Sequence, residues 1–369
     1  MKHNWEYKPW QEVLTIINGK NQKNVESPHG QYPIYGSGGI MSYANSYLCP
    51  EDSVILGRKG SINKPIFVKT KFWNVDTAFG IVPNKSCIEA KFLYYFCVDY
   101  DFMRHNRATT LPSLVKADLL KIVMPIPPLV VQRRIVEELD GINSVIEAKR
   151  EQIKQLDLLA QSLFYTMFGN PVYNDFDWEC TTLGTIASFK NGLNYAPDES
   201  GKPIKCLGVG CFKDNKYLSP SDFLVLSISD SISNEYLLKD NDIVFVRSNG
   251  NKALIGRSVL VRDVDEDCTF SGFCIRCRVN SDSVNHSYLL HLLRTKEVRA
   301  VLTSSGRGCN IANINQKTLN AFPIILPPLE LQRKFAAKVE AIEARKGEIE
   351  KSLRELQTLL DSRMDYWFN

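Results

Sequence analysis

The chain has 369 residues, of which 44% are hydrophobic and 23% are charged, and its formal net charge is +4. This composition excludes a disordered chain, and the length suggests two or three folded domains. The small positive charge permits a nucleic-acid partner without requiring one. No apolar run approaches the length of a membrane span and the sequence opens without a secretory signal, so we expect a cytoplasmic protein.

The first 126 residues are predicted to form a mixed α/β domain. Its glycine-rich stretch has neither the lysine of a phosphate-binding loop nor the GxGxxG spacing, so it does not predict a nucleotide site. The elements expected in chain order are a short helix or strand at 10–18, the glycine-rich stretch at 31–40, a strand followed by a basic turn at 53–63, a strand at 76–83 and an aromatic-rich helix at 91–102.

The loops of this domain combine glycine with arginine, lysine, serine and asparagine. Arginine can make paired hydrogen bonds to guanine and asparagine to adenine, while backbone N–H groups in glycine turns can reach phosphates. Surface turns of any α/β domain are polar, however, so the loops by themselves leave DNA contact undecided. The residues predicted to contact DNA are Tyr32, Tyr35, Ser37, Arg58, Lys59, Ser61, Asn63, Arg104, Asn106 and Arg107.

A long helix is predicted over 127–170. It opens with Pro-Pro-Leu-Val-Val-Gln-Arg, where the prolines suit the first helical turn, and it ends at Gly169 before Pro171. Core-type positions recur in alternating steps of four and three, a heptad repeat flawed at Lys149 that predicts a coiled coil. The predicted interface positions are Ile135, Leu139, Ile142, Ile146, Ile153, Leu156 and Leu163.

Residues 171–326 are predicted to form a second domain that repeats the element order of the first. The segment 242–250 corresponds to 52–60 at an offset of 190, and 307–314 corresponds to 107–114 at an offset of 200. Similar spacing with different loops suits two readers of different sequences, although an old duplication with drifting loops would look the same. The DNA contacts predicted here are Arg247, Ser248, Asn249, Asn251, Lys252, Arg257, Ser305 and Arg307.

Residues 327–369 are predicted to form a second long helix, opening with Pro-Pro-Leu-Glu-Leu-Gln-Arg at an offset of 200 from the first. Each helix of about 40 residues would be ~60 Å long. The two are expected to pair antiparallel; the alternative is two independent amphipathic helices, each packed on its own domain. The interface positions predicted in this helix are Phe335, Val339, Ile342, Ile349, Leu353, Leu356 and Leu360.

The sequence offers little for catalysis. Asn170–Tyr173 carries only part of the Asn-Pro-Pro-Tyr motif of adenine methyltransferases and is interpreted as a linker, and no ATP-binding Walker A motif occurs. Cys274 and Cys277 form a CxxC pair without a convincing second pair, so zinc is not expected, and the ten cysteines are predicted to be reduced thiols. We therefore predict no catalytic residue, no metal and no cofactor bound by this chain.

The order domain–helix–domain–helix, with both helices opened by Pro-Pro-Leu-x-x-Gln-Arg, resembles the specificity subunit of type I restriction–modification systems along the whole chain. The resemblance implies an α+β protein: two mixed α/β target-recognition domains joined by two long helices in an antiparallel coiled coil, with a pseudo-two-fold internal repeat. It also implies a non-catalytic subunit of a host-defence complex. Each domain would read one half of a split, asymmetric DNA site, and the coiled coil would set the spacer.

The partners that the resemblance implies are double-stranded DNA, two adenine-N6 methyltransferase (modification) subunits that carry S-adenosylmethionine, and in some systems two restriction subunits that use ATP and Mg²⁺. The specificity subunit of a two-subunit or fused restriction system would have the same sequence features. Two other classes stay open. A non-enzymatic coiled-coil scaffold would lack salt-dependent binding to duplex DNA, and an enzyme would require turnover by the purified chain alone.

Overall fold

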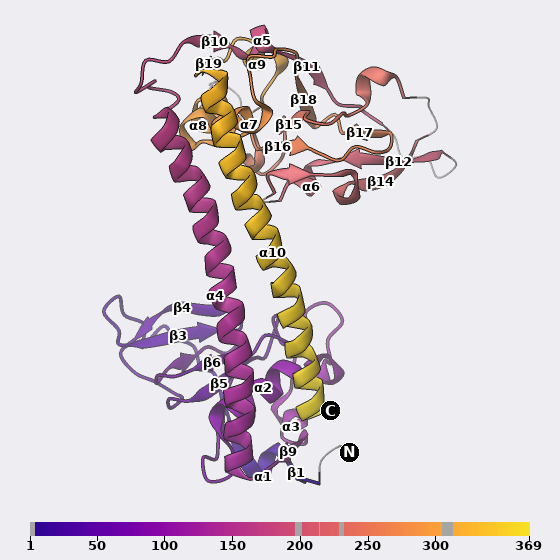
Figure 1. Cartoon of the computed structure of the whole chain (residues 1–369). Coiled ribbons are helices and arrows are strands. Elements are labelled where there is room, and N and C mark those ends of the chain that lie inside the picture. Colours follow the sequence, from indigo (N-terminus) through magenta and orange to yellow (C-terminus); the bar gives the residue numbers. More distant parts are fainter. Residues whose placement is uncertain (1–3, 196–200, 214, 229–231, 305–312) are drawn as a thin grey trace. The chain divides into compact units, whose positions relative to one another are not determined.

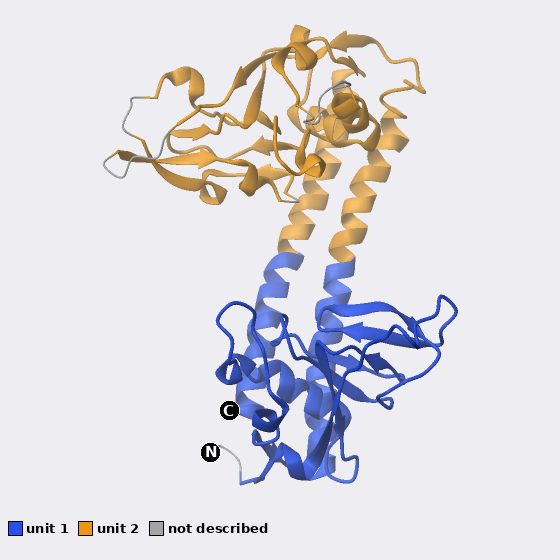
Figure 2. Ribbon diagram, turned by 180° about the vertical axis from the view of Figure 1, so that it is seen from behind, with its two compact units in different colours: residues 1–151, 349–369 blue, residues 152–348 orange. Residues whose placement is uncertain are grey.

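The structure, a computed structural model, describes residues 4–195, 201–213, 215–228, 232–304 and 313–369. The chain forms two compact units, one made of residues 1–151 and 349–369 and the other of residues 152–348 (Figures 1 and 2). Each unit holds one α/β domain together with part of each long helix. In the described part of the chain, no helix combines the length and apolarity needed to cross a bilayer.

The first unit contains a four-stranded antiparallel sheet of order β2-β8-β5-β6 and a three-stranded sheet of order β4-β3-β7. The central strand β5 is buried at all five residues, as expected for a short continuous apolar run. A separate ladder pairs β1 with β9. The strands are β1 (Glu6–Pro9), β2 (Leu14–Asn18), β3 (Tyr32–Gly36), β4 (Gly39–Ala44), β5 (Ser53–Gly57), β6 (Ile66–Val68), β7 (Trp73–Asn74), β8 (Ala78–Pro83) and β9 (Val123–Ile126).

The main helix of this domain, α2, begins at a side-chain cap. The carboxylate of Glu89 accepts a hydrogen bond from the Phe92 N–H at 2.9 Å, which satisfies one of the unpaired donors of the first turn. Fully buried Trp10, Phe92 and Phe102 anchor the core beneath the sheet. The helices are α1 (Trp10–Val13), α2 (Ala90–Asp99), α3 (Lys116–Leu119) and the 3₁₀ helix η1 (Phe102–His105).

The second unit repeats this plan with a five-stranded sheet, order β11-β18-β15-β16-β13, and a three-stranded sheet, order β14-β12-β17. A ladder of β10 with β19 takes the place of β1 with β9. The strands are β10 (Cys180–Thr182), β11 (Ala187–Asn191), β12 (Lys202–Leu207), β13 (Tyr217–Leu218), β14 (Leu224–Ile228), β15 (Ile243–Val246), β16 (Ser258–Val261), β17 (Cys268–Phe270), β18 (Cys274–Val279) and β19 (Pro323–Ile325).

The helices of the second domain also follow the first. Asn285 caps α7 by accepting from the Tyr288 N–H at 3.0 Å, in the place that Glu89 has before α2. The helices are α5 (Leu183–Ile186), α6 (Val209–Phe212), α7 (His286–Arg294), α8 (Lys296–Ser304) and α9 (Gln316–Asn320), with 3₁₀ helices η2 (Pro220–Asp222), η3 (Asn234–Tyr236) and η4 (Lys252–Leu254).

The β-ladders align the two copies more closely than the sequence does. The Arg58 N–H donates to the Thr77 carbonyl and the Arg247 N–H donates to the Phe273 carbonyl, each at 2.8 Å and each just past a buried central strand. Arg58 therefore corresponds to Arg247, an offset of 189 rather than the 190 predicted from sequence. The one-residue error arose because Asp52 was matched to Asp242, whereas the ladders match Ser53 to Asp242.

The two long helices are α4 (Leu129–Phe168) and α10 (Leu329–Phe368), each of 40 residues. Arg363 pairs with Glu138 in the first unit, and Lys346 pairs with Asp157 at 2.8 Å in the second. From the first pair to the second, the residue number rises along α4 and falls along α10. The helices therefore pair antiparallel, and the predicted coiled coil is confirmed. Gly169, with φ +72°, ends α4 as expected.

The repeated Pro-Pro-Leu-x-x-Gln-Arg motif has a structural role in its glutamine. Gln132 is fully buried; its amide donates to the Cys87 and Pro127 carbonyls at 2.8 Å and accepts from the Glu89 N–H at 2.8 Å. Gln332 repeats this arrangement with Ser283, Pro327 and Asn285. Each glutamine thus fastens the start of a long helix to the cap of the domain helix, because buried main-chain groups need partners.

The ends of the long helices are part of the domain cores. Phe164 and Phe168 of α4 pack with Phe335 and Tyr288 in the second unit, whereas Phe368 of α10 packs in the first. All fourteen predicted interface positions are buried or half-buried. Which of them contact the opposite helix stays a prediction. The heptad repeat predicted from the sequence did not include Phe164, Phe168 and Phe368 as core positions. Each of them follows a position of that repeat by one residue.

Candidate nucleic-acid interface

Three segments of the first unit meet at the end of β5. The Gly60 N–H donates to the Pro112 carbonyl at 2.9 Å, and the Leu114 N–H donates to the Arg58 carbonyl at 2.9 Å. A Cβ on Gly60 would lie 3.9 Å from the Ser37 hydroxyl, which places the β3–β4 hairpin beside the same turn. The structure therefore brings together predicted DNA contacts from distant parts of the sequence: Ser37, Arg58, Lys59, Ser61 and Arg107.

Gly57 permits this turn to close. A side chain there would meet the Ser61 carbonyl oxygen at 2.3 Å, so only glycine fits. The Arg58 guanidinium lies 5.7 Å from the centre of the Phe79 ring and Arg58 is half-buried, whereas Lys59 is exposed. Arg107 forms an ion pair with Asp118 at 2.7 Å. The turn at the end of the inner strand β5 thus carries Arg58 and Lys59, and Arg107 lies beside it.

Two of the predicted DNA contacts have structural partners within the domain. Asn63 donates to an Asp101 carboxylate oxygen at 2.8 Å and accepts from the Phe102 N–H at 2.8 Å. The Asn106 amide holds the following turn by bonds to Ala108 and to the Ser113 N–H. Arg104, at the end of η1, is exposed. DNA contact by these three residues stays a prediction.

Tyr32 and Tyr35 line a hollow of about 620 Å³ on the β3–β4 hairpin, together with Tyr43, Lys69 and Lys71. The Tyr32 ring lies 5.1 Å from the Tyr47 ring, and the Tyr35 ring packs edge-on against Phe72 at 5.7 Å. Burial raises the pKa of Tyr35, so its phenol is neutral at physiological pH. Neutral aromatic faces beside lysines suit contact with nucleotides.

The matching turn of the second unit carries Arg247, which is half-buried. The Arg247 carbonyl accepts from the Ile314 N–H at 3.1 Å, as the Arg58 carbonyl accepts from Leu114. Ser248 and Asn249 follow in the turn, and Asn251 caps η4, where Lys252 is exposed. Arg257 donates to the Lys213 carbonyl. The remaining predictions, Ser305 and Arg307, lie outside the described residues.

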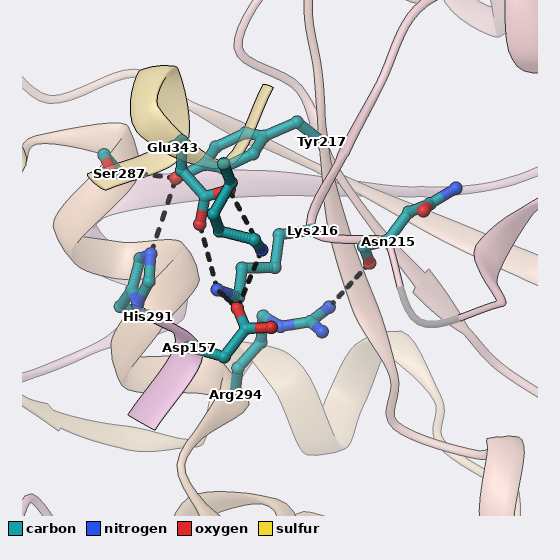
Figure 3. Close-up of polar contacts among 9 residues, drawn as sticks. Asp157, Asn215, Lys216, Tyr217, Ser287, His291, Arg294 and Glu343 are labelled. Carbon is teal, nitrogen blue, oxygen red and sulfur yellow. Dashed lines mark hydrogen bonds and ion pairs between the residues drawn. The ribbon is translucent and has the colours of Figure 1, made fainter. Parts of the chain in front are cut away.

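A charged network that sequence reasoning missed joins the second domain to both long helices (Figure 3). Asp157 of α4 bonds to Lys216 at 2.7 Å and to Lys346 of α10 at 2.8 Å, and Lys216 also bonds to Glu343 at 2.9 Å. Burial alone would raise the pKa of Asp157, but the two lysines outweigh it and the pKa lies below its usual value. The carboxylate is therefore ionised and helps to hold both helices on the domain.

His291 lies beside this network without a proton to exchange near neutral pH. Burial lowers its pKa to about 3, and the nearby Lys216 and Arg294 add to the shift. The neutral ring contacts the Tyr217 hydroxyl at 3.4 Å (Figure 3). A base or acid working near neutral pH needs a pKa near that range, so this histidine is a packing residue.

The thiols of Cys274 and Cys277 are buried on β18, and burial raises the pKa of each. A raised pKa keeps the thiol protonated, whereas metals bind the thiolate. Among the described residues, no group of three or more His, Cys, Asp or Glu side chains could hold a metal ion.

Comparison with known families identifies the chain. A family model described as the type I restriction modification DNA specificity domain matches it twice, over residues 2–158 and 177–358. The chain belongs to this family. The two matches follow the internal repeat of the specificity chain, one on each α/β domain with its long helix.

Characterised relatives of this specificity chain share a modest fraction of its residues. It is 25% identical to the StySPI type I restriction enzyme specificity subunit of Salmonella potsdam, over 85% of this chain and 72% of the relative. It is 23% identical to the EcoKI specificity subunit of Escherichia coli K12, over 83% and 70%. The crystal structure of a type I S subunit from M. genitalium has the same fold, with a TM-score of 0.60 and 16% identity over 99% of this chain and 96% of that one.

Proposed function

We propose that this chain reads a split, asymmetric DNA sequence, one half with each unit. The observation that carries the proposal is the shared frame of Arg58 and Arg247. Both follow a buried central strand, and the backbone groups of both bond to corresponding segments of the two units, yet the side chains around them differ between the units. A fixed frame with variable side chains is what reading two different half-sites requires.

The chain acts in this proposal as the non-catalytic subunit of a larger complex. Two modification subunits carrying S-adenosylmethionine methylate adenine, and restriction subunits with ATP and Mg²⁺ join in some systems. This chain itself binds no cofactor. The long antiparallel helices set the distance between the half-sites and offer the docking surface. The chain of a two-subunit or fused restriction system would do the same work with different partners.

Sequencing of methylated adenines tests the proposal. DNA is exposed to the neighbouring modification subunit with this chain, and separately to that subunit alone. A split motif that appears only when this chain is present establishes the specificity role and identifies both half-sites with their spacer. Methylation of identical sites in both samples contradicts it.

Alanine at Arg58 or at Arg247 should each affect one half-site only. Loss of a base-reading arginine costs roughly 1–3 kcal/mol and relaxes discrimination at one position, whereas the other half-site keeps its sequence. The measurement is the methylated motif of each variant. Lys121→Ala, at an exposed basic residue just after α3, is the control and should leave both half-sites unchanged. Loss of discrimination in both half-sites from either arginine variant would contradict the assignment of one turn to each half.

A further inference from the structure

A small hollow in the second unit is lined largely by arginine. Its volume is about 150 Å³, and its lining consists of Gly256, Arg257, Ser258, Arg294 and Arg299. None of these lining residues is acidic. Burial lowers the pKa of Arg294 to about 10, and the nearby guanidinium groups of Arg257 and Arg299 add to the shift. Asp157 offsets part of this shift for Arg294, but the guanidinium groups still repel each other, and an anion between them would relieve that repulsion.

Main-chain carbonyls hold the side chains of Arg294 and Arg299 in place. Arg294 of α7 donates through Nη1 to the Asn215 carbonyl at 3.1 Å (Figure 3) and to the Ser258 carbonyl. Arg299 of α8 donates through Nη2 to the Ala253 carbonyl and to the Ile255 carbonyl at 3.4 Å. Neutral acceptors orient a guanidinium but leave its full charge, and each guanidinium has five N–H donors, more than these bonds use.

The first unit, described from residue 4 onward, does not repeat this cluster at the positions that can be matched. The helix caps Glu89 and Asn285 correspond, so Arg294 corresponds to Val98, which is 47% exposed. The ladders of the central strands with β6 and β16 likewise match Arg257 to Lys64. The arginine cluster is therefore a feature of the second unit that the first unit lacks, and this difference indicates a ligand that only the second unit binds.

We propose that the hollow binds a phosphate group of the DNA backbone, with Arg294 and Arg299 as the donors. Planar guanidinium groups match phosphate oxygens, and the hollow has room for a single small anion. It adjoins the predicted reading turn, because the Gly256 N–H donates to the carbonyl of Val246, the residue before Arg247. The inference rests on the proposed DNA-reading function and adds that the second unit has a phosphate contact that the first lacks.

The test is the salt dependence of duplex binding by the full chain. A fluorescent duplex of three helical turns is titrated at several chloride concentrations. Arg299→Gln should lower the slope of log affinity against log salt by about 0.9, the value for one lost phosphate contact. Arg299→Lys keeps the charge and should keep most of the slope. Lys296→Gln removes one charge from an exposed residue of the same helix and should leave the slope unchanged.

The results of this titration distinguish failure of the phosphate site from failure of the proposed DNA-reading function. If the wild-type chain shows no salt-dependent duplex binding, the proposed function fails. If it binds and Arg299→Gln keeps the wild-type slope, the phosphate site is wrong. Circular dichroism checks that each variant is folded, and Arg294→Gln, which also removes one positive charge from the hollow, serves as a second variant if Arg299→Gln unfolds.

A competition arm distinguishes DNA from free phosphate as the ligand. Inorganic phosphate at constant ionic strength should weaken duplex binding by the wild type more than by Arg299→Gln. If phosphate raises the melting temperature of the wild type but the slope of Arg299→Gln is unchanged, the hollow takes a free anion, and the DNA contact is overturned.

Discussion

Phe368→Ala at the C-terminal end of the chain is expected to destabilise the first unit by about 3–5 kcal/mol, the usual cost of emptying a buried phenylalanine site. Its ring lies 5.3 Å from Phe92 and 6.0 Å from Phe96, inside the core formed by the N-terminal domain. The residue is distant in sequence from that domain yet completes its core. Hydrogen exchange at β5 and β8 is the measurement, because it reports opening of that unit alone.

Phe168→Ala is the counterpart, 200 residues earlier, and should loosen β15 and β18 of the second unit instead. Leu359→Ala on α10 is the control, since Leu359 is 46% exposed and its loss should cost little. Faster exchange in the second unit from Phe368→Ala, with the first unit unaffected, would show that the end of α10 does not belong to the N-terminal core.

Seven residues inserted into both long helices are expected to lengthen the DNA spacer and leave the two half-sites unchanged. The insertions belong after Glu151 and after Glu348, the two unit boundaries, so that both units keep their own contacts. Seven helical residues add about 10.5 Å, so the spacer should grow by up to about three base pairs. The measurement is the sequence motif that is methylated when the variant acts together with the modification subunit.

Insertion into α4 alone is the matched control. It would shift one helix against the other, so that Glu138–Arg363 and Asp157–Lys346 could not both form. That variant should lose stability rather than gain a longer spacer. A doubly inserted chain that folds and still methylates at the original spacing would contradict the role of the helices in setting the spacer.

Local patterns in the sequence were sufficient for much of the architecture. The four–three spacing of apolar residues marked both long helices, because helical side chains share a face at that period. The glycine and proline after Phe168 marked the end of α4, since glycine adopts the positive φ that the stop requires. The strand at 53–57 followed from an unbroken apolar run.

The candidate site was harder to predict from the sequence than the architecture was. Arg58 and Lys59 were found from glycine-flanked basic residues, but the roles of Asn63 and Asn106 within the domain depend on Asp101, Phe102 and Ser113. The hollow lined by Arg294 and Arg299 had no sequence signal, because its residues come from α7, α8, the turn before β16 and the start of β16. Spacing along the chain does not reveal such convergence.

The duplication, the helix–domain order and the family resemblance could all be predicted from the sequence, because periodicity and repeated motifs are local properties of the chain. Contacts in the folded chain were needed to show that Arg58 corresponds to Arg247, that Gln132 and Gln332 fasten the helices to the domain caps, and that Phe368 belongs to the first core. Those outcomes depend on how buried polar groups find partners and how aromatic rings fill space, and both are settled by contacts between segments far apart in the chain.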